Sequence, residues 1–171
     1  EIQVTFDNFT AFVGRNDIGK STVLEALDIF FNDGKGIIKL DKDDINKQGN
    51  EDISITVCFE DLPDTIVIDA ANQTTLKDEY LLNTNRQLEV IKKYPKTGKP
   101  RVFVKANHPI DENCCDLLLK KNAELRKIVQ ENTIQCENQT INAVMRKAIW
   151  DHFGASLNLQ ETEIDVSKAD A

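Results

Sequence analysis

Residues 14–21 read Gly-Arg-Asn-Asp-Ile-Gly-Lys-Ser and match the pattern G-x-x-x-x-G-K-[ST] at every fixed position. An apolar run of strand type, residues 10–13, precedes this stretch, and residues 21–31 follow it with helical spacing. When a strand, a glycine-rich loop and a helix follow in this order, the backbone N–H groups of the loop and of the helix start can point at a bound phosphate. The stretch therefore predicts a P-loop that holds a nucleoside triphosphate with Mg²⁺.

The fixed positions of this loop each have a physical role. Gly14 and Gly19 permit backbone angles and a close approach to phosphate that a Cβ atom would prevent. Lys20 supplies a cation for the β- and γ-phosphates, and the Ser21 hydroxyl is the expected Mg²⁺ ligand. We assign no catalytic residue. The residues expected to bind ATP are Gly14, Asn16, Asp17, Ile18, Gly19, Lys20, Ser21 and Thr22.

Composition sets the broad class of the protein. Of its 171 residues, 40% are hydrophobic and 29% are charged, and the formal net charge is −8. One globular domain, or a domain with an appendage, fits these values, and the acidic balance argues against a dominant nucleic-acid surface. The sequence has no secretory signal or membrane-spanning stretch, and its four cysteines lack metal-ligand spacing. We therefore expect a cytoplasmic protein with reduced thiols, and a chain that begins inside a domain.

A β pattern follows the first helix. Residues 53–59 alternate apolar and polar side chains, which is typical of a strand with one solvent-facing side. Residues 87–94 and 101–105 are two further strand-like runs, and the turn between them contains Pro and Gly, which predicts a hairpin. The basic side chains of this hairpin can contact a DNA backbone or can simply be solvated, and we favour solvation. They are Lys92, Lys93, Lys96, Lys99, Arg101 and Lys105.

The last third of the chain is predicted to be helical and polar. Residues 116–131 have the spacing of one helix, and residues 141–153 have that of a second, which ends at Gly154. Beyond Leu159 apolar residues are few. We expect the chain to fray there or to continue into a further segment.

The acidic residues that a P-loop ATPase needs for hydrolysis are not evident in the sequence. Hydrolysis usually requires an Asp at the end of a buried strand, which holds Mg²⁺ and the attacking water. The one candidate is Asp69 in the run Ile66-Val67-Ile68-Asp69, but Ala70 follows where a catalytic Glu often stands. The sequence thus predicts ATP binding more firmly than ATP cleavage.

The region around the loop resembles a known family. Residues 12–27, Phe-Val-Gly-Arg-Asn-Asp-Ile-Gly-Lys-Ser-Thr-Val-Leu-Glu-Ala-Leu, are similar to the opening of ABC-type ATPases of the OLD (overcoming lysogenization defect) family and their RecF- and SMC-like relatives. Asn16 matches the Asn of the family pattern G-x-N-x-x-G-K-[ST]. Asp17 replaces the Gly more common in SMC-like members and looks like a variant found in some OLD-type ATPases. The specific match covers about residues 1–31, and the rest is similar in layout only.

The resemblance implies an α/β P-loop NTPase fold: an ABC-type ATPase head lobe with a mixed β-sheet and a helical insert. Residues 1–110 would form the N-terminal lobe, and residues 111–171 would begin a helical arm or a dimerisation insert. The parent would be an ATP-dependent DNA endonuclease of phage defence or repair, with later motifs completing the site. Its cofactors would be ATP and Mg²⁺, and its partners DNA and a second copy, in a homodimer or higher oligomer.

Two other classes of function remain open. A self-contained P-loop phosphotransferase would use Asp69 for Mg²⁺. A nucleotide-gated interaction module would bind ATP without cleaving it.

Overall fold

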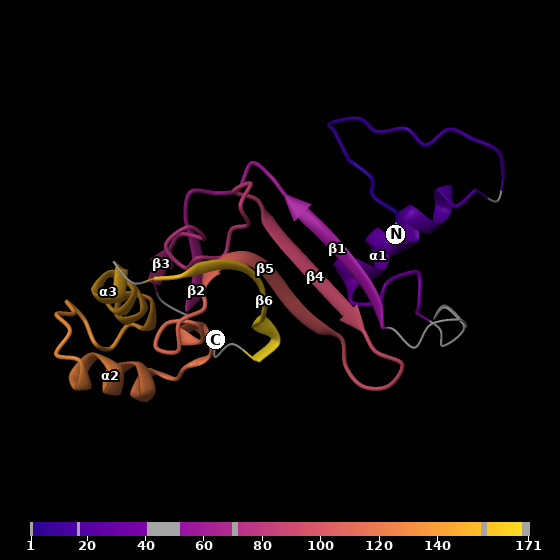
Figure 1. Cartoon of the computed structure of the whole chain (residues 1–171). Helices are drawn as coiled ribbons and strands as arrows, with labels where there is room; N and C mark the ends of the chain where they lie inside the picture. The colour runs from indigo at the N-terminus through magenta and orange to yellow at the C-terminus, as the bar shows by residue number, and fades with distance from the viewer. Residues whose placement is uncertain (1, 17, 41–51, 70–71, 155–156, 169–171) are drawn as a thin grey trace. The chain divides into compact units, whose positions relative to one another are not determined.

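The chain divides into two compact units, Glu1–Glu51 and Asp52–Ala171. The computed structural model describes residues 2–16, 18–40, 52–69, 72–154 and 157–168 (Figure 1).

A single helix, α1 (Lys20–Asn32), dominates the described part of the first unit. Gly19 precedes it with a φ of 87°, and Asp33 follows it with a φ of 53°. The N–H of Gly34 donates to the carbonyl of Ile29 at 3.0 Å, which is a common way for a helix to end. The helix predicted after the loop is therefore confirmed.

The segment ahead of the loop forms no strand among its described residues, so the strand predicted at 10–13 is wrong. The N–H of Asp7 donates to the Thr10 hydroxyl at 2.9 Å, and the rings of Phe6 and Phe12 meet edge to face at 6.1 Å. Val13 remains 91% exposed. A strand needs a hydrogen-bonded neighbour, and the described residues of this unit supply none.

The second unit is built on a four-stranded antiparallel sheet in the order β1-β4-β5-β6. β1 (Ile53–Phe59) pairs with β4 (Leu88–Tyr94), and β4 forms a hairpin with β5 (Arg101–Pro109). Side chains of β1 alternate between half-buried and exposed. The predicted strand 53–59 and the predicted hairpin are confirmed, although β5 runs four residues beyond the predicted 105.

The last strand, β6 (Leu159–Asp165), corrects the expected fraying after Leu159. It pairs with residues 103–109 of β5 over its whole length. Ile164 is the one buried residue of β6. The strand is therefore held by its backbone ladder, which an apolar pattern does not reveal.

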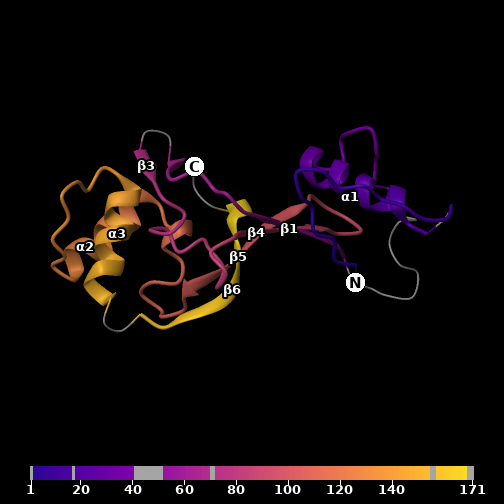
Figure 2. The same cartoon turned by 90° about the horizontal axis from the view of Figure 1, so that it is seen from above.

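The helical region differs from the prediction in one place. A short 3₁₀ helix, η2 (Leu117–Leu119), is separated from α2 (Asn122–Glu131) by extended backbone at Lys120 and Lys121, so residues 116–131 are not one helix. α3 (Asn142–Phe153) ends at Gly154 as predicted. Figure 2 shows α2 and α3 side by side at one end of this unit.

Two buried clusters stabilise the second unit. The first joins η2, α2 and α3 and consists of Cys114, Leu117, Leu125, Val129, Ile134, Met145, Ile149 and Trp150. The second covers the sheet and consists of Leu76, Leu81, Val104, Ala106, Leu118 and Ile164. Smaller elements complete the unit: a two-stranded antiparallel sheet of β2 (Ile66–Asp69) and β3 (Asn72–Thr74), and a final 3₁₀ turn, η4 (Val166–Lys168).

The described elements thus combine α-helices with antiparallel sheets, in agreement with the expected α/β class. A lobe of residues 1–110 and an arm of residues 111–171 stay a prediction. None of the described helices is long and apolar enough to cross a bilayer.

Candidate phosphate-binding loop

The loop 14–21 leads directly into the first turn of α1. No side chain caps the start of this helix, and its first turn holds no acidic residue. The first N–H groups of a helix have no partner within it, and the aligned peptide dipoles add positive potential there. This helix start therefore favours an anion.

The two glycines of the motif act differently. Gly19 has a φ of 87°, in the left-handed region that a residue with a Cβ atom seldom adopts. At Gly14 the restriction is contact, because a Cβ atom there would lie 2.2 Å from Cδ1 of Ile18. Gly19 thus sets the backbone direction at the helix start, whereas Gly14 leaves room for the loop to curl.

The Lys20 side chain folds back over the loop. Its Nζ donates hydrogen bonds to the carbonyls of Gly14 at 2.9 Å and Arg15 at 2.5 Å. No carboxylate lies within ion-pair distance of this ammonium among the described residues. The two ends of the loop are therefore joined by a cation whose partners among the described residues are neutral carbonyl groups.

The remaining predicted contacts lie around this lysine. The side chains of Asn16, Ile18, Ser21 and Thr22 are exposed. Asp17 lies outside the described residues. Binding of nucleotide by these residues and binding of metal by Ser21 stay predictions.

The comparison with protein families agrees with this geometry. The family model described as the AAA ATPase domain matches residues 1–171. The chain belongs to the AAA ATPase domain family. This membership places it among the P-loop NTPases, as residues 14–21 indicate. No curated protein and no solved structure gave a significant match.

The acidic residue considered for Mg²⁺ in this AAA ATPase domain lies on an unsuitable strand. β2, which ends at Asp69, belongs to the second unit and pairs antiparallel with β3. Val67 in its middle is 62% exposed, whereas the strand before such an aspartate should be buried on both faces. The phosphotransferase interpretation therefore gains no support from β2.

The basic hairpin of the AAA ATPase domain is partly neutralised. At least three of its six cations have carboxylate partners, which reduces the charge available for a DNA backbone. Hydrogen bonding to Glu161 and the nearby charge of Glu89 raise the pKa of Lys105. The pairs are Lys93–Glu163 at 2.5 Å, Arg101–Asp52 at 3.6 Å, and Lys105 with Glu161 at 3.2 Å and Glu89 at 3.7 Å.

No sequence pattern predicted the buried ion pair between Glu79 and Arg146. The two side chains are 1% and 2% exposed, and they make a bidentate contact with N–O distances of 2.7 and 3.0 Å. They join the turn after β3 to α3 across 67 positions of sequence. No local spacing connects two such residues, so only the tertiary structure reveals them.

Proposed function

We propose that loop 14–21 binds ATP with Mg²⁺. The observation that carries this proposal is the Lys20 ammonium, which is held by the carbonyls of Gly14 and Arg15 beside an uncapped helix start. A triphosphate offers negatively charged oxygens to the ammonium and to the free N–H groups together. Membership of the AAA ATPase domain family supports the choice of ATP.

Each residue of the loop has a place in this proposal. On binding, Lys20 exchanges its two carbonyl partners for β- and γ-phosphate oxygens, which form stronger charge-assisted hydrogen bonds. The exposed Ser21 hydroxyl supplies one oxygen ligand to Mg²⁺, and the exposed Thr22 hydroxyl donates to the α-phosphate. The backbone of Gly14 and Gly19 and the loop residues Asn16, Asp17 and Ile18 provide the remaining contacts.

We further propose that the chain is the N-terminal ATP-binding part of an OLD-like ATP-dependent DNA endonuclease of phage defence or repair. The similarity of residues 12–27 to that family supports this, and so does the apolar surface of the first unit. Exposed apolar side chains in such number are expected where another part of a protein covers them. The apolar side chains that are 46–93% exposed here are Ile2, Phe6, Phe9, Val13, Ile18, Leu24, Phe31 and Ile37.

In this proposal residues 1–110 form a lobe of an ABC-type head and residues 111–171 begin a helical arm. Further parts of the parent, or a second copy in a homodimer, cover the apolar surface and complete the ATP site. DNA is a partner of that cytoplasmic parent protein.

Calorimetric titration with MgATP tests the loop directly. We expect Lys20→Ala to weaken binding at least tenfold, because it removes charged hydrogen bonds worth about 1.5–3 kcal/mol. Lys35→Ala removes an exposed lysine just beyond α1 and should leave the affinity unchanged. Ser21→Ala should weaken binding in Mg²⁺ but not in EDTA. Equal affinities for the Lys20→Ala chain and the unchanged chain would exclude the loop as the site.

Single-turnover hydrolysis tests whether further parts are needed. We expect the 171-residue chain to bind ATP without cleaving it, because no base or acidic Mg²⁺ ligand accompanies the loop among its described residues. Robust cleavage that Asp69→Ala abolishes would instead identify a self-contained phosphotransferase.

A further inference from the structure

The second unit contains a cavity that the proposed ATP site does not use. Its volume is about 460 Å³, and it lies between α3, the turn after β3 and the loop 83–87. Tyr80, Leu82, Asn107 and Leu159 form part of its lining, and Arg86 and Lys77 add positive charge. Its volume is within the range of small-molecule sites, and most of its lining residues are polar.

An aromatic ring in this lining is held in a fixed position. The half-buried ring of Tyr80 meets Trp150 edge to face at 5.2 Å and His108 at 6.5 Å. Trp150 is itself fixed, because its Nε1 donates to the carbonyl of Cys114 at 3.1 Å. His108 Nδ1 lies 2.9 Å from the Tyr80 carbonyl. A fixed and partly exposed aromatic ring is a platform on which a flat ligand can stack.

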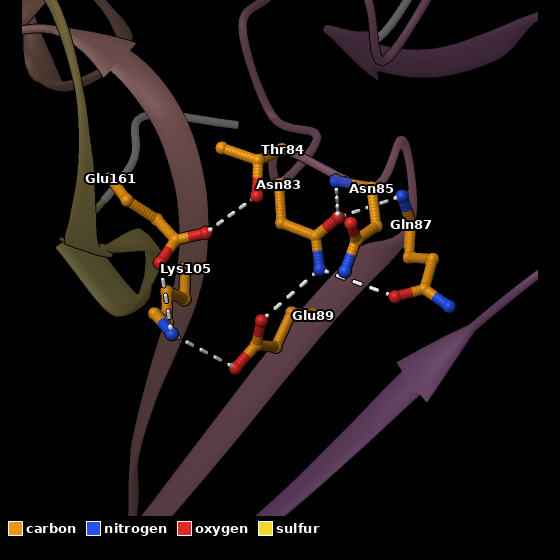
Figure 3. A network of polar contacts seen from close by, with 7 residues as sticks. All are labelled: Asn83, Thr84, Asn85, Gln87, Glu89, Lys105 and Glu161. Carbon is orange, nitrogen blue, oxygen red and sulfur yellow. Dashed lines mark hydrogen bonds and ion pairs between the residues drawn. The ribbon is translucent and has the colours of Figure 1, made fainter.

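Another part of the lining, loop 83–87, is held by the carboxamide of Asn83. Figure 3 shows its Oδ1 accepting the backbone N–H groups of Asn85 and Gln87, both at 3.0 Å. Its Nδ2 donates to Glu89 at 3.2 Å, which ties the loop to β4. The loop is therefore preorganised by side-chain hydrogen bonds within the protein.

The same loop is also joined to β6 and presents a cation. The Thr84 hydroxyl donates to Glu161 at 3.3 Å, and Glu161 pairs with Lys105 (Figure 3). Arg86 has a φ of 63°, and its N–H donates to the Asn83 carbonyl at 3.0 Å. Tyr80 likewise has a positive φ, of 53°. Two side chains of the cavity are thus presented by backbone conformations that cost about 1 kcal/mol or more each.

The cavity offers more donors than the protein uses. In the described part of the chain, the guanidinium of Arg86, the ammonium of Lys77 and the carboxamide of Asn107 have no side-chain partner. The Tyr80 hydroxyl has no hydrogen-bond partner there either. Three basic residues and two acidic ones line the cavity, the remaining three being Lys147, Asp78 and Asp151. The lining has a net positive charge in a chain whose net charge is −8.

We propose that this cavity binds a nucleoside monophosphate group. Its base stacks on Tyr80, the Asn107 carboxamide pairs with the base edge, and the phosphate contacts Arg86 and Lys77. The group is either a free nucleotide or one residue of a single-stranded nucleic acid. All of its lining residues belong to the second unit, whereas loop 14–21 belongs to the first.

The chain provides its own optical probe for the test. Trp150 is the only tryptophan and touches Tyr80, so stacking on Tyr80 should change its fluorescence. AMP and a tetrathymidylate are titrated separately into the Lys20→Ala chain, in which binding at loop 14–21 is weakened. We expect a saturable change with at least one of them. A tetrathymidylate that binds tenfold more tightly than AMP identifies a strand as the ligand, and AMP that binds as well or better identifies a free nucleotide.

Charge variants locate the binding. We expect Arg86→Gln and Lys77→Gln each to weaken it about tenfold, because each removes a charged hydrogen bond. Lys99→Gln, which removes an exposed lysine outside the cavity, is the matched control and should have no effect. Arg86→Gly removes the same charge and relieves the positive φ, so it tests the contact even if Arg86→Gln folds poorly. The absence of saturable binding at millimolar ligand, or equal weakening by Lys99→Gln, overturns the proposal.

Discussion

The two units of this chain are stabilised in opposite ways. The first contains the P-loop of the AAA ATPase domain, yet Ile29 and Phe30 are the only hydrophobic side chains buried among its described residues. The second carries no recognisable motif but buries two apolar clusters and an ion pair. The proposed phosphate-binding site is thus encoded in a few neighbouring residues, whereas stability arises from contacts between residues far apart in sequence.

The largest loss of stability is expected in the second unit, from Arg146→Ala. It leaves the buried Glu79 carboxylate without its partner, and breaking such a pair costs about 3–5 kcal/mol. Lys147→Ala is the control, because this exposed neighbour lies 3.9 Å from Asp78, in a pair worth less than about 1 kcal/mol. Urea unfolding of both variants measures the difference. Similar losses from the two would show that the buried pair does not stabilise this unit.

The same substitution, valine to alanine, should change the free energy of unfolding by different amounts in the two units. Val129 in α2 is 1% exposed, and Val129→Ala should lower the free energy of unfolding by about 2 kcal/mol. Val13 ahead of the P-loop is 91% exposed, and Val13→Ala should change it by less than about 0.5 kcal/mol. If Val13→Ala proves as destabilising as Val129→Ala, the apolar surface of the first unit is covered in solution.

A smaller loss of stability is expected when the pH is lowered. Burial lowers the pKa of His108 below its ordinary value of 6.5, so the folded chain binds its proton less readily than the unfolded chain. Stability from this residue is present above pH 6.5 and declines below it, by at most about 1.4 kcal/mol per pH unit. Urea unfolding at pH 7.5 and 5.5 measures the decline, and His108→Gln should reduce it. An unchanged decline in that variant would assign the effect to other groups.

The smallest expected difference in stability is between alanine substitutions at the two glycines of the P-loop. Gly19→Ala introduces a Cβ atom at a φ of 87° and should destabilise the start of α1 by about 1 kcal/mol. Gly14→Ala should cost less, because the Cβ atom meets only the end of the exposed Ile18 side chain, which can turn away. Hydrogen exchange of the α1 amides, without nucleotide, measures both. Faster exchange in the Gly14→Ala chain than in the Gly19→Ala chain would contradict this order.

Local patterns predicted those parts of the fold that depend on neighbouring residues. The alternation over 53–59 and the turn of the β4–β5 hairpin sufficed to place three strands, and the spacing after Lys20 sufficed for α1. The strand at 10–13 failed because a strand requires a partner. β6 was missed because its ladder with β5, and not an apolar face, holds it.

The two candidate sites also differ in how far the sequence alone could predict them. The P-loop is contiguous, so its residues could be named from the sequence. The cavity near α3 combines Tyr80, Arg86 and Asn107, which come from two turns and a strand. Both turns depend on positive φ angles at non-glycine residues, and no periodicity marks such positions.

The pairing of β5 with β6 also has a consequence for the order of events during synthesis. The β4–β5 hairpin is complete once residue 109 has been made, but the second edge of β5 has no partner until residue 165. At about 5–20 residues per second, the ribosome needs roughly 3–11 s to add this stretch. Throughout that interval the nascent chain presents an open strand edge, to which another nascent chain can add. The helices α2 and α3 lie in this stretch, and their early collapse would hold the start of β6 near the end of β5, so that β6 can pair as soon as it has been made.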